Sequence, residues 1–235
     1  MITRIARTTG KILLCLAMVY VVMVGFALLL TKVFDHSALS NAEDDVNTTL
    51  ANHRDKLLND LTYVLSGLGN TAAIIGALLV VAVAMRFALK RWPESVFLVV
   101  AVSGQALVFF FVQLTVTRQR PHVKRLDSSP PTSSFPSGHT GAATALFVAS
   151  ALLVAWYVHR RWVKILGVTV LLAVPLLVAY GRLYRGMHHP TDVLAAFLNA
   201  LACVTIASVF VLNRRLWGEP KDPSRAPTPV SEGAP

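Results

Sequence analysis

Three short polar clusters contain side chains that can bind a phosphate group and act on it. They are Thr117–Pro121, Phe135–Thr140 and Gly181–Asp192, and each lies at the end of a long apolar run. Histidine can serve as nucleophile, general acid or general base near neutral pH. Arg120 and Arg182 carry planar guanidinium groups whose geometry matches phosphate oxygens. The residue types therefore predict phosphate chemistry, provided that the fold brings the clusters together.

The second cluster places Ser137, Gly138 and His139 directly before an apolar run. A helix that begins here offers free N–H groups and a partial positive charge, which suit a phosphate. Ser137 can cap the helix or donate its hydroxyl, and Gly138 lets the backbone approach an oxyanion closely. Taken alone, the same residues also fit an ordinary helix cap with a chance histidine.

The third cluster contains a histidine and a carboxylate four residues apart. Pro190 suits the first turn of a helix, which puts Asp192 in that turn and His188 just before it. The Asp192 carboxylate can then accept a bond from one imidazole nitrogen and leave the other as nucleophile or base. A metal held by His188 and His189 is the alternative. Because there is no His-Glu-x-x-His pattern and no cluster of carboxylates, we expect neither a metal nor another cofactor.

The chain also contains six charge-free runs, and each is close to the roughly 20 residues that a membrane-spanning helix needs. The chain has 235 residues, of which 54% are hydrophobic and 14% charged, which argues against both a soluble domain and a disordered chain. The runs do not alternate apolar and polar residues, as barrel strands would. We therefore predict an all-α polytopic membrane protein, a bundle of six transmembrane helices within residues 1–217. The expected spans are Ile12–Thr31, Leu61–Met85, Ser95–Thr117, Thr140–Val158, Ile165–Gly181 and Val193–Asn213.

The distribution of charge predicts the orientation of the bundle. One side carries thirteen Lys/Arg and four Asp/Glu, a net charge of +9, and the other carries nine and eight, a net charge of +1. The positive-inside bias places both termini in the cytoplasm and all three clusters on the outer face. The same bias accounts for the basic composition, so we expect no nucleic-acid partner.

Two further segments flank the apolar runs. Ser40 and Glu43 have capping-box spacing, and apolar residues follow at helical intervals over about residues 40–60. This amphipathic segment is expected to lie on the membrane surface or to cover a lipid-binding site. Residues 218–235 are rich in Pro and Ser and are expected to form a disordered cytoplasmic tail.

The clusters resemble the three signature motifs of the type 2 phosphatidic acid phosphatase (PAP2) family of membrane enzymes. The first motif, Lys-x6-Arg-Pro, is matched by Arg120-Pro121, with Gln113 at the lysine position. The second, Pro-Ser-Gly-His, is matched in full by Pro136–His139. The third, Ser-Arg-x5-His-x3-Asp, is matched at Arg182, His188 and Asp192, with Gly181 at the serine position. The resemblance covers about residues 60–213.

The resemblance implies a role for each matching residue. His188 would attack phosphorus to form a phosphohistidine, Asp192 would orient it, and His139 would protonate the leaving oxygen and then activate water. The family uses no metal. The groups implied to stabilise the phosphoryl charge are Arg120, Arg182, Ser137 and Gly138, together with Gln113 in place of the lysine. Because Gln113 lacks a charge, Arg118 is expected to supply the missing cation.

These features together predict a lipid phosphatase or diphosphatase at the outer face of a bacterial plasma membrane. Its partners would be membrane lipids and a lipid substrate such as undecaprenyl diphosphate or another isoprenoid diphosphate, phosphatidic acid or phosphatidylglycerol phosphate. A lipid phosphotransferase would use the same residues. A transporter or flippase, a non-catalytic member and a pure scaffold are the remaining alternatives. The sequence leaves the oligomeric state open.

Overall fold

The computed structural model describes residues 2–34, 37–128 and 132–212, and all regular elements in these ranges are helices. Six of them are long and apolar enough to cross a membrane: α1 with its short π-helical extension, and α4 to α8. The all-α, six-span architecture is thus confirmed. The elements are α1 (Ile2–Leu28), η1 (Leu29–Val33), α2 (Ala38–Asn52), α3 (Lys56–Gly67), α4 (Thr71–Leu89), α5 (Pro93–Thr115), α6 (Gly138–Tyr157), α7 (Arg161–Tyr184) and α8 (Pro190–Val211).

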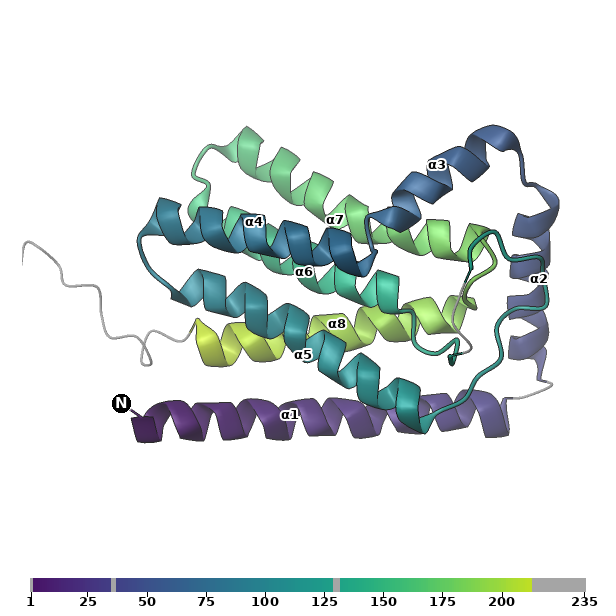
Figure 1. Cartoon of the computed structure of the whole chain (residues 1–235), viewed down its shortest axis with the longest axis horizontal. Coiled ribbons are helices and arrows are strands. Elements are labelled where there is room, and N and C mark those ends of the chain that lie inside the picture. The colour runs from purple at the N-terminus through teal and green to yellow at the C-terminus, as the bar shows by residue number, and fades with distance from the viewer. Residues whose placement is uncertain (1, 35–36, 129–131, 213–235) are drawn as a thin grey trace, which may run out of the picture.

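Helices α5, α6 and α8 form the centre of the bundle, and α1, α4 and α7 surround them (Figure 1). Small side chains lie at the central contacts, where Ala143, Ala149, Ala200 and Ala207 are fully buried. Side chains of this size let helix backbones approach closely, which is the usual basis of packing between helices in a bilayer.

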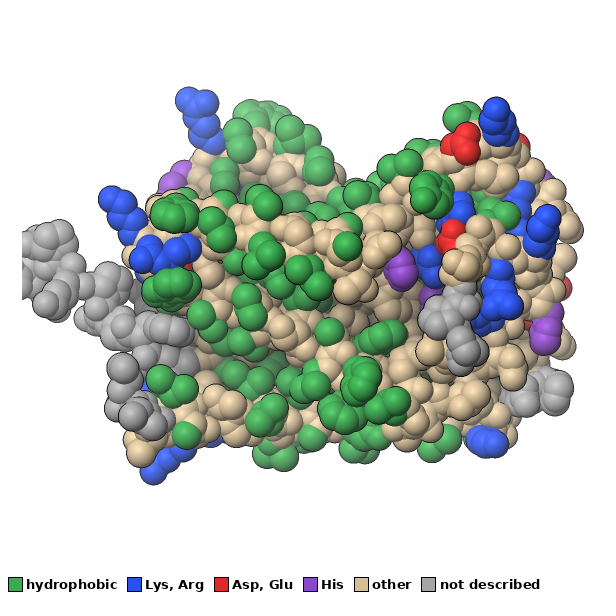
Figure 2. Space-filling model, in the orientation of Figure 1, with side chains coloured by type: hydrophobic (Ala, Val, Ile, Leu, Met, Phe, Trp, Pro, Cys, Tyr) green, Lys and Arg blue, Asp and Glu red, His purple; other side chains and the backbone are tan. Residues whose placement is uncertain are grey.

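The surface of the bundle is divided into bands. Figure 2 shows hydrophobic side chains over the middle of the molecule and charged side chains gathered at its two ends. Many of the hydrophobic ones are exposed, among them Val22, Val80 and Phe87. Such a broad exposed apolar surface requires lipid around it, so the chain is an integral membrane protein.

The second expected span is wrong in its first ten residues. Residues Leu61–Gly67 belong to α3, and α4 begins at Thr71 after a turn, with the Asn70 side chain accepting a bond from the Ala72 N–H. The turn requires glycine at position 69, because a Cβ there would lie 2.8 Å from the His139 carbonyl oxygen. The apolar run is therefore continuous in sequence although the turn divides it between two helices, α3 and α4 (Figure 1).

The amphipathic segment forms two helices instead of one. The N-cap of α2 is Ser37 and not the expected Ser40, so Glu43 has no capping role in α2 itself. The polar residues Glu43 and Asn47 of α2, and Thr62 and Ser66 of α3, face the protein and are buried. The apolar residues face outwards, as Leu57, Leu61 and Val64 do on α3. Helix α2 runs across one end of the bundle, and α3 leads from it back to α4 (Figure 1).

We refer to this end of the bundle as the α2 end. It also carries the loop between α5 and α6 and the short connection between α7 and α8. The expected tail, 218–235, lies outside the described residues.

Candidate active site

A cavity of about 580 Å³ opens between α4, α5 and α6 and brings the sequence clusters together. Arg120, His139, Arg182 and His188 line its polar part, near the α2 end. Its remaining wall is mostly apolar and is formed by Ile74, Ile75, Leu78, Val102, Ala106, Phe109 and Ala142. One space therefore joins a cationic pocket to a surface that suits a hydrocarbon chain.

His188 is held by a backbone carbonyl. Its Nδ1 lies 2.8 Å from the Ser134 carbonyl oxygen, and its side chain is almost completely buried. Because a carbonyl can only accept, Nδ1 carries the proton and Nε2 carries the lone pair. The nearest Asp192 oxygen is 3.8 Å from Nδ1, too far for the hydrogen bond that the sequence suggests. The expected orienting bond is thus supplied by Ser134, and Asp192 acts on the ring through its charge. Burial lowers the pKa of His188, so the ring stays neutral at physiological pH.

Both carboxylate oxygens of Asp192 accept hydrogen bonds. Its Oδ2 accepts from the Ser134 hydroxyl and from the His189 N–H, the latter at 2.8 Å. Its Oδ1 accepts from Arg118 at 2.5 Å, and none of the side chain is exposed. These three groups fix the carboxylate in position beside the imidazole ring.

The start of α6 carries His139 into the cavity. Gly138 also lines the cavity, and a Cβ at this position would lie 2.9 Å from the Phe109 ring. Ser137 is different, because its hydroxyl bonds to Thr140 at 3.0 Å and its N–H donates to the Asp192 carbonyl at 3.1 Å. Ser137 therefore ties α6 to α8, and it is not among the residues that line the cavity.

Two arginines face the same space. Arg120 Nη1 donates to the Met187 carbonyl at 2.7 Å, and burial lowers the pKa of Arg120. Arg182 Nη1 donates to Ser66 at 2.9 Å and to Asp127 at 3.1 Å. Its Nε is buried and has no partner within the described parts of the chain. An anion in the cavity would satisfy this donor.

Comparison with known proteins gives the family. The sequence pattern of the PAP2 superfamily matches residues 94–216, which is more than half of the chain. The chain belongs to the PAP2 superfamily. It is therefore a membrane phosphatase, as the motifs predict.

Relatives and solved structures agree with this family. Phosphatidylglycerophosphatase B of Bacillus subtilis (strain 168) is 24% identical over 179 residues, 73% of this chain and 84% of the relative. An undecaprenyl-diphosphatase of Sulfolobus acidocaldarius is 30% identical over 102 residues, 43% and 45% of the two chains.

Two crystal structures share the fold. A transmembrane PAP2 type phosphatidylglycerolphosphate phosphatase from Bacillus subtilis has a TM-score of 0.71 at 22% identity, covering 81% of this chain and 94% of that one. Aquifex aeolicus LpxE has a TM-score of 0.56 at 21% identity, covering 69% and 92%.

The structure explains how this PAP2 chain accommodates glutamine at the lysine position of the first motif. Gln113 Nε2 donates to the carbonyls of Ser133 and Phe135, both at 3.1 Å. Gln113 lines the cavity, but its amide N–H groups are used to hold the α5–α6 loop. Its Oε1 is buried without a partner in the described residues.

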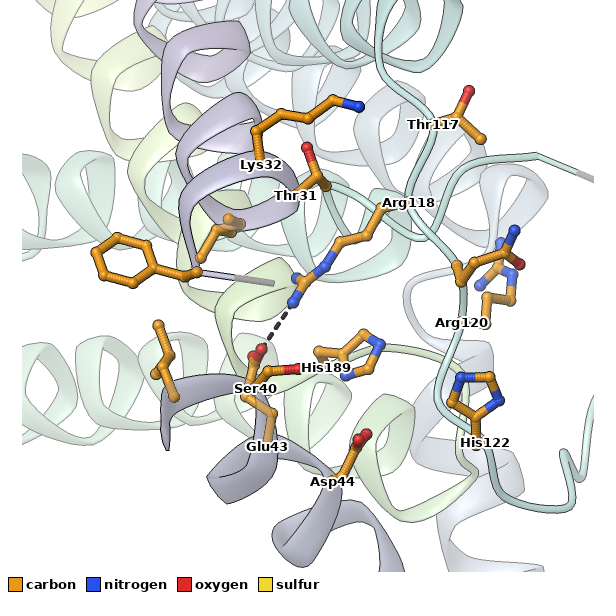
Figure 3. A pocket seen from close by; sticks show the side chains of 14 residues that line it. Thr31, Lys32, Ser40, Glu43, Asp44, Thr117, Arg118, Arg120, His122 and His189 are labelled. Carbon is orange, nitrogen blue, oxygen red and sulfur yellow. Dashed lines mark hydrogen bonds and ion pairs between the residues drawn. The ribbon is translucent and has the colours of Figure 1, made fainter. Parts of the chain in front are cut away.

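Arg118, which is expected to replace the missing lysine, is not among the residues that line the cavity, and its role as that cation stays a prediction. Its guanidinium bonds to Asp192, to Thr191 at 2.8 Å and to Glu43 at 2.7 Å, and it lines a separate polar pocket of about 250 Å³ (Figure 3). The sequence places Arg118 near the site, but it does not show that the guanidinium points towards Asp192 and Glu43. Asp192 and Glu43 outweigh the effect of burial and raise the pKa of Arg118, so the residue stays charged.

The serine missing from the third motif has a counterpart on another helix. A Cβ at Gly181 would lie 3.2 Å from the Ser66 backbone nitrogen and 3.3 Å from the Thr62 carbonyl oxygen. Glycine at this position allows α3 to pack closely on α7, and this packing delivers the Ser66 hydroxyl to Arg182. Sequence reasoning misses Ser66 because α3 lies outside all three motifs.

The connection between α7 and α8 is held from both sides. Gly186 has φ 70°, a left-handed conformation that favours glycine, and it turns the chain towards His188. Asp127 bonds to Arg185 at 2.6 Å and to Arg182. Burial alone would raise the pKa of Asp127, but the hydrogen bonds and charge of Arg185 outweigh burial and lower that pKa. Arg54 donates to the Tyr184 carbonyl at 3.0 and 2.8 Å.

Among the residues that the structure describes, no group of three or more His, Cys, Asp or Glu is arranged to hold a metal ion. The metal independence expected from the sequence stays a prediction.

Proposed function

We propose that this chain hydrolyses a phosphate monoester or a diphosphate of a lipid through a phosphohistidine on His188. The observation that carries the proposal is the composition of the 580 Å³ cavity, which has two histidines and two arginines at one end and an apolar wall along the rest. A phosphate head group matches the first part and a hydrocarbon chain matches the second. A soluble phosphate ester would leave the apolar wall empty.

The geometry supports the following sequence of steps. The lone pair on His188 Nε2 attacks phosphorus, and the N–P bond forms as the P–O bond to the lipid breaks. His139 donates its proton to the departing oxygen. Arg120 and Arg182 stabilise the charge on the phosphoryl oxygens, and the unpartnered Arg182 Nε is one donor available for it.

The second step restores the enzyme. His139, now neutral, takes a proton from a water molecule whose oxygen attacks the phosphorus. The N–P bond breaks, inorganic phosphate leaves, and His188 Nε2 regains its lone pair. With a diphosphate substrate the leaving group is the lipid monophosphate, and the steps are otherwise the same.

The positive charge that develops on the His188 ring needs compensation. Asp192 is buried and lies 3.8 Å from Nδ1, where its carboxylate stabilises the charged ring without removing its proton. The Ser134 carbonyl accepts the same N–H throughout.

The names of the relatives suggest the substrates to test first. They are phosphatidylglycerol phosphate and undecaprenyl diphosphate, to which we add phosphatidic acid. We propose that the site faces the outside of the cell, on the strength of the charge bias of the two faces.

The test is release of inorganic phosphate by the purified protein in detergent or proteoliposomes, across this panel and with EDTA present. A soluble ester such as glycerol phosphate serves as the control for the apolar wall. We expect turnover of at least one lipid substrate, with a far higher kcat/KM than for the soluble ester. A phosphorylated acceptor lipid without free phosphate would identify a phosphotransferase instead, and lipid movement without hydrolysis would identify a transporter.

A further inference from the structure

Glu43 is a buried acidic residue that none of the catalytic motifs contains. Only 4% of its side chain is exposed, although it belongs to α2, which runs across the end of the bundle. Its Oε1 accepts from the Thr191 N–H at 2.8 Å and from the Thr191 hydroxyl at 2.6 Å. Its Oε2 accepts from Arg118 at 2.7 Å (Figure 3).

Arg118 joins Glu43 to Asp192. The same guanidinium donates to Glu43 through Nη2 and to Asp192 through Nη1. The three side chains are 4%, 11% and 0% exposed, so solvent screens their interaction poorly. They form a row, Glu43–Arg118–Asp192, that leads from α2 to the carboxylate beside His188.

The net charge of this row decides how well Asp192 can stabilise a charged imidazole. Arg118 and Asp192 alone would form a neutral pair, and a neutral pair attracts a cation weakly. Glu43 balances Arg118, so the row of three carries a net charge of −1. The negative charge beside His188 is thereby preserved.

We propose that Glu43 is a positioning residue that neutralises Arg118 and so keeps Asp192 electrostatically effective towards His188. The inference rests on the proposed role of His188 as the nucleophile. It gives α2 a part in catalysis, because the helix brings the balancing charge to the site when it docks on the start of α8.

Other charged groups also act on His188, and they are the same whether or not Glu43 carries its charge. Arg182 from α7 and Arg120 from the α5–α6 loop both disfavour a charged ring, as does His139 from α6 when it is protonated. Asp192 is the carboxylate beside the ring that opposes these cations. Its effect on the ring therefore depends on whether the charge of Arg118 is neutralised by Glu43.

The test is a double-mutant cycle with Glu43→Gln and Arg118→Gln. Glu43→Gln leaves the row neutral, and kcat should fall by about tenfold or more with KM changed less than about twofold. Arg118→Gln leaves two carboxylates facing each other and should also lower kcat. The double variant has the wild-type net charge of −1, and its kcat should exceed that of Glu43→Gln by about threefold or more.

The rescue distinguishes charge balance from a mechanical clamp. Each substitution removes a contact between α2 and the site, so a clamp predicts that the double variant is no more active than the weaker single variant. The melting temperature in detergent is measured alongside. We expect the double variant to be less stable than Glu43→Gln and yet more active. Asp45→Asn, which removes an exposed charge from the same helix, is the matched control and should leave kcat unchanged.

A double variant no more active than Glu43→Gln would overturn the inference while wild-type turnover left the proposed function intact. A wild-type protein that hydrolyses none of the lipid phosphates would overturn the proposed function, and this inference with it.

Discussion

Histidine 188 is the residue on which the proposed chemistry depends, and it owes its orientation to a main-chain atom. The Ser134 carbonyl fixes the tautomer, so the orientation does not require the Asp192 carboxylate. This division separates two tasks that one carboxylate is expected to perform. Ser134 directs Nε2 towards the substrate, and Asp192 supplies charge.

The two histidines should have separable defects. His188→Ala removes the nucleophile, so no covalent phosphoenzyme should form with radiolabelled substrate. His139→Ala should still form it when the leaving group needs little protonation, and should then release phosphate slowly, about 10² to 10⁴ times below wild type. Rapid quench at alkaline pH, where phosphohistidine survives, measures both. A phosphoenzyme in His188→Ala would contradict the assignment.

Burial of His188 predicts the acidic side of the pH profile. Its pKa lies below the usual 6.5 because burial disfavours the charged ring. A lowered pKa keeps the nucleophile neutral as the pH falls, so kcat/KM should persist below pH 6.5 and be lost only at lower pH. Titration of the substrate phosphate in the same detergent distinguishes the ionisation of the substrate from that of the enzyme. A midpoint above 6.5 that belongs to the enzyme would speak against a buried, neutral nucleophile.

Ser66 and Gly181 give a test of the displaced hydroxyl. Ser66→Ala removes a bond to Arg182 and should weaken phosphate binding, raising KM by about three- to tenfold, the equivalent of one hydrogen bond. Gly181→Ser should not repair it, because the new Cβ meets the backbone of Ser66 and Thr62. That variant should instead be destabilised by about 1–3 kcal/mol, as for other overpacked sites. Steady-state kinetics and unfolding in detergent measure the two effects, and full rescue by Gly181→Ser would refute the account.

Motif residues could be predicted from sequence, whereas their supports could not. Arg120, His139, Arg182 and His188 share one cavity, as their residue types and spacing suggest. Their supports include a backbone carbonyl, which no residue type encodes, and Ser66, which is 116 positions from Arg182. Arg118 shows a further limit, because spacing gives its neighbourhood and not the direction of its guanidinium.

At the scale of elements, α3 is the least expected part of the fold. It buries polar residues against α7 and exposes apolar ones, the reverse of a helix in water. From hydropathy alone, the end of α3 and the whole of α4 look like one span, because the turn at Gly67–Asn70 lies within a continuous apolar run. Five of the six spans could be placed from the sequence, since charged or polar residues bound them on both sides.

The exposed apolar face of α3 predicts immersion in lipid that deepens along the helix. A fluorophore on Val64→Cys should be quenched most by nitroxides placed deep on the acyl chain, and one on Leu57→Cys by shallower nitroxides. Cys15 and Cys203 are first replaced by Ala. Equal, shallow quenching at both positions would mean that α3 lies flat on the surface.

The whole molecule has an orientation that the charge of its ends predicts. In cells that carry a single cysteine, Lys56→Cys should react with an impermeant thiol reagent and Arg160→Cys should not. Both positions are exposed, so access depends on the side of the membrane alone. Labelling of Arg160→Cys in intact cells, with Lys56→Cys protected, would reverse the orientation and put the proposed site in the cytoplasm.

The contact between Glu43 and Thr191 also determines when the site can come into being. The two residues are 148 positions apart, and the second lies in the first turn of α8. During synthesis α2 is therefore made long before Thr191, so Glu43 cannot yet have this partner. The contact can form only after the start of α8 has been made. Truncated or partly inserted chains thus lack the assembled Asp192 network, and the enzyme's maturation is coupled to the completion of its own biogenesis.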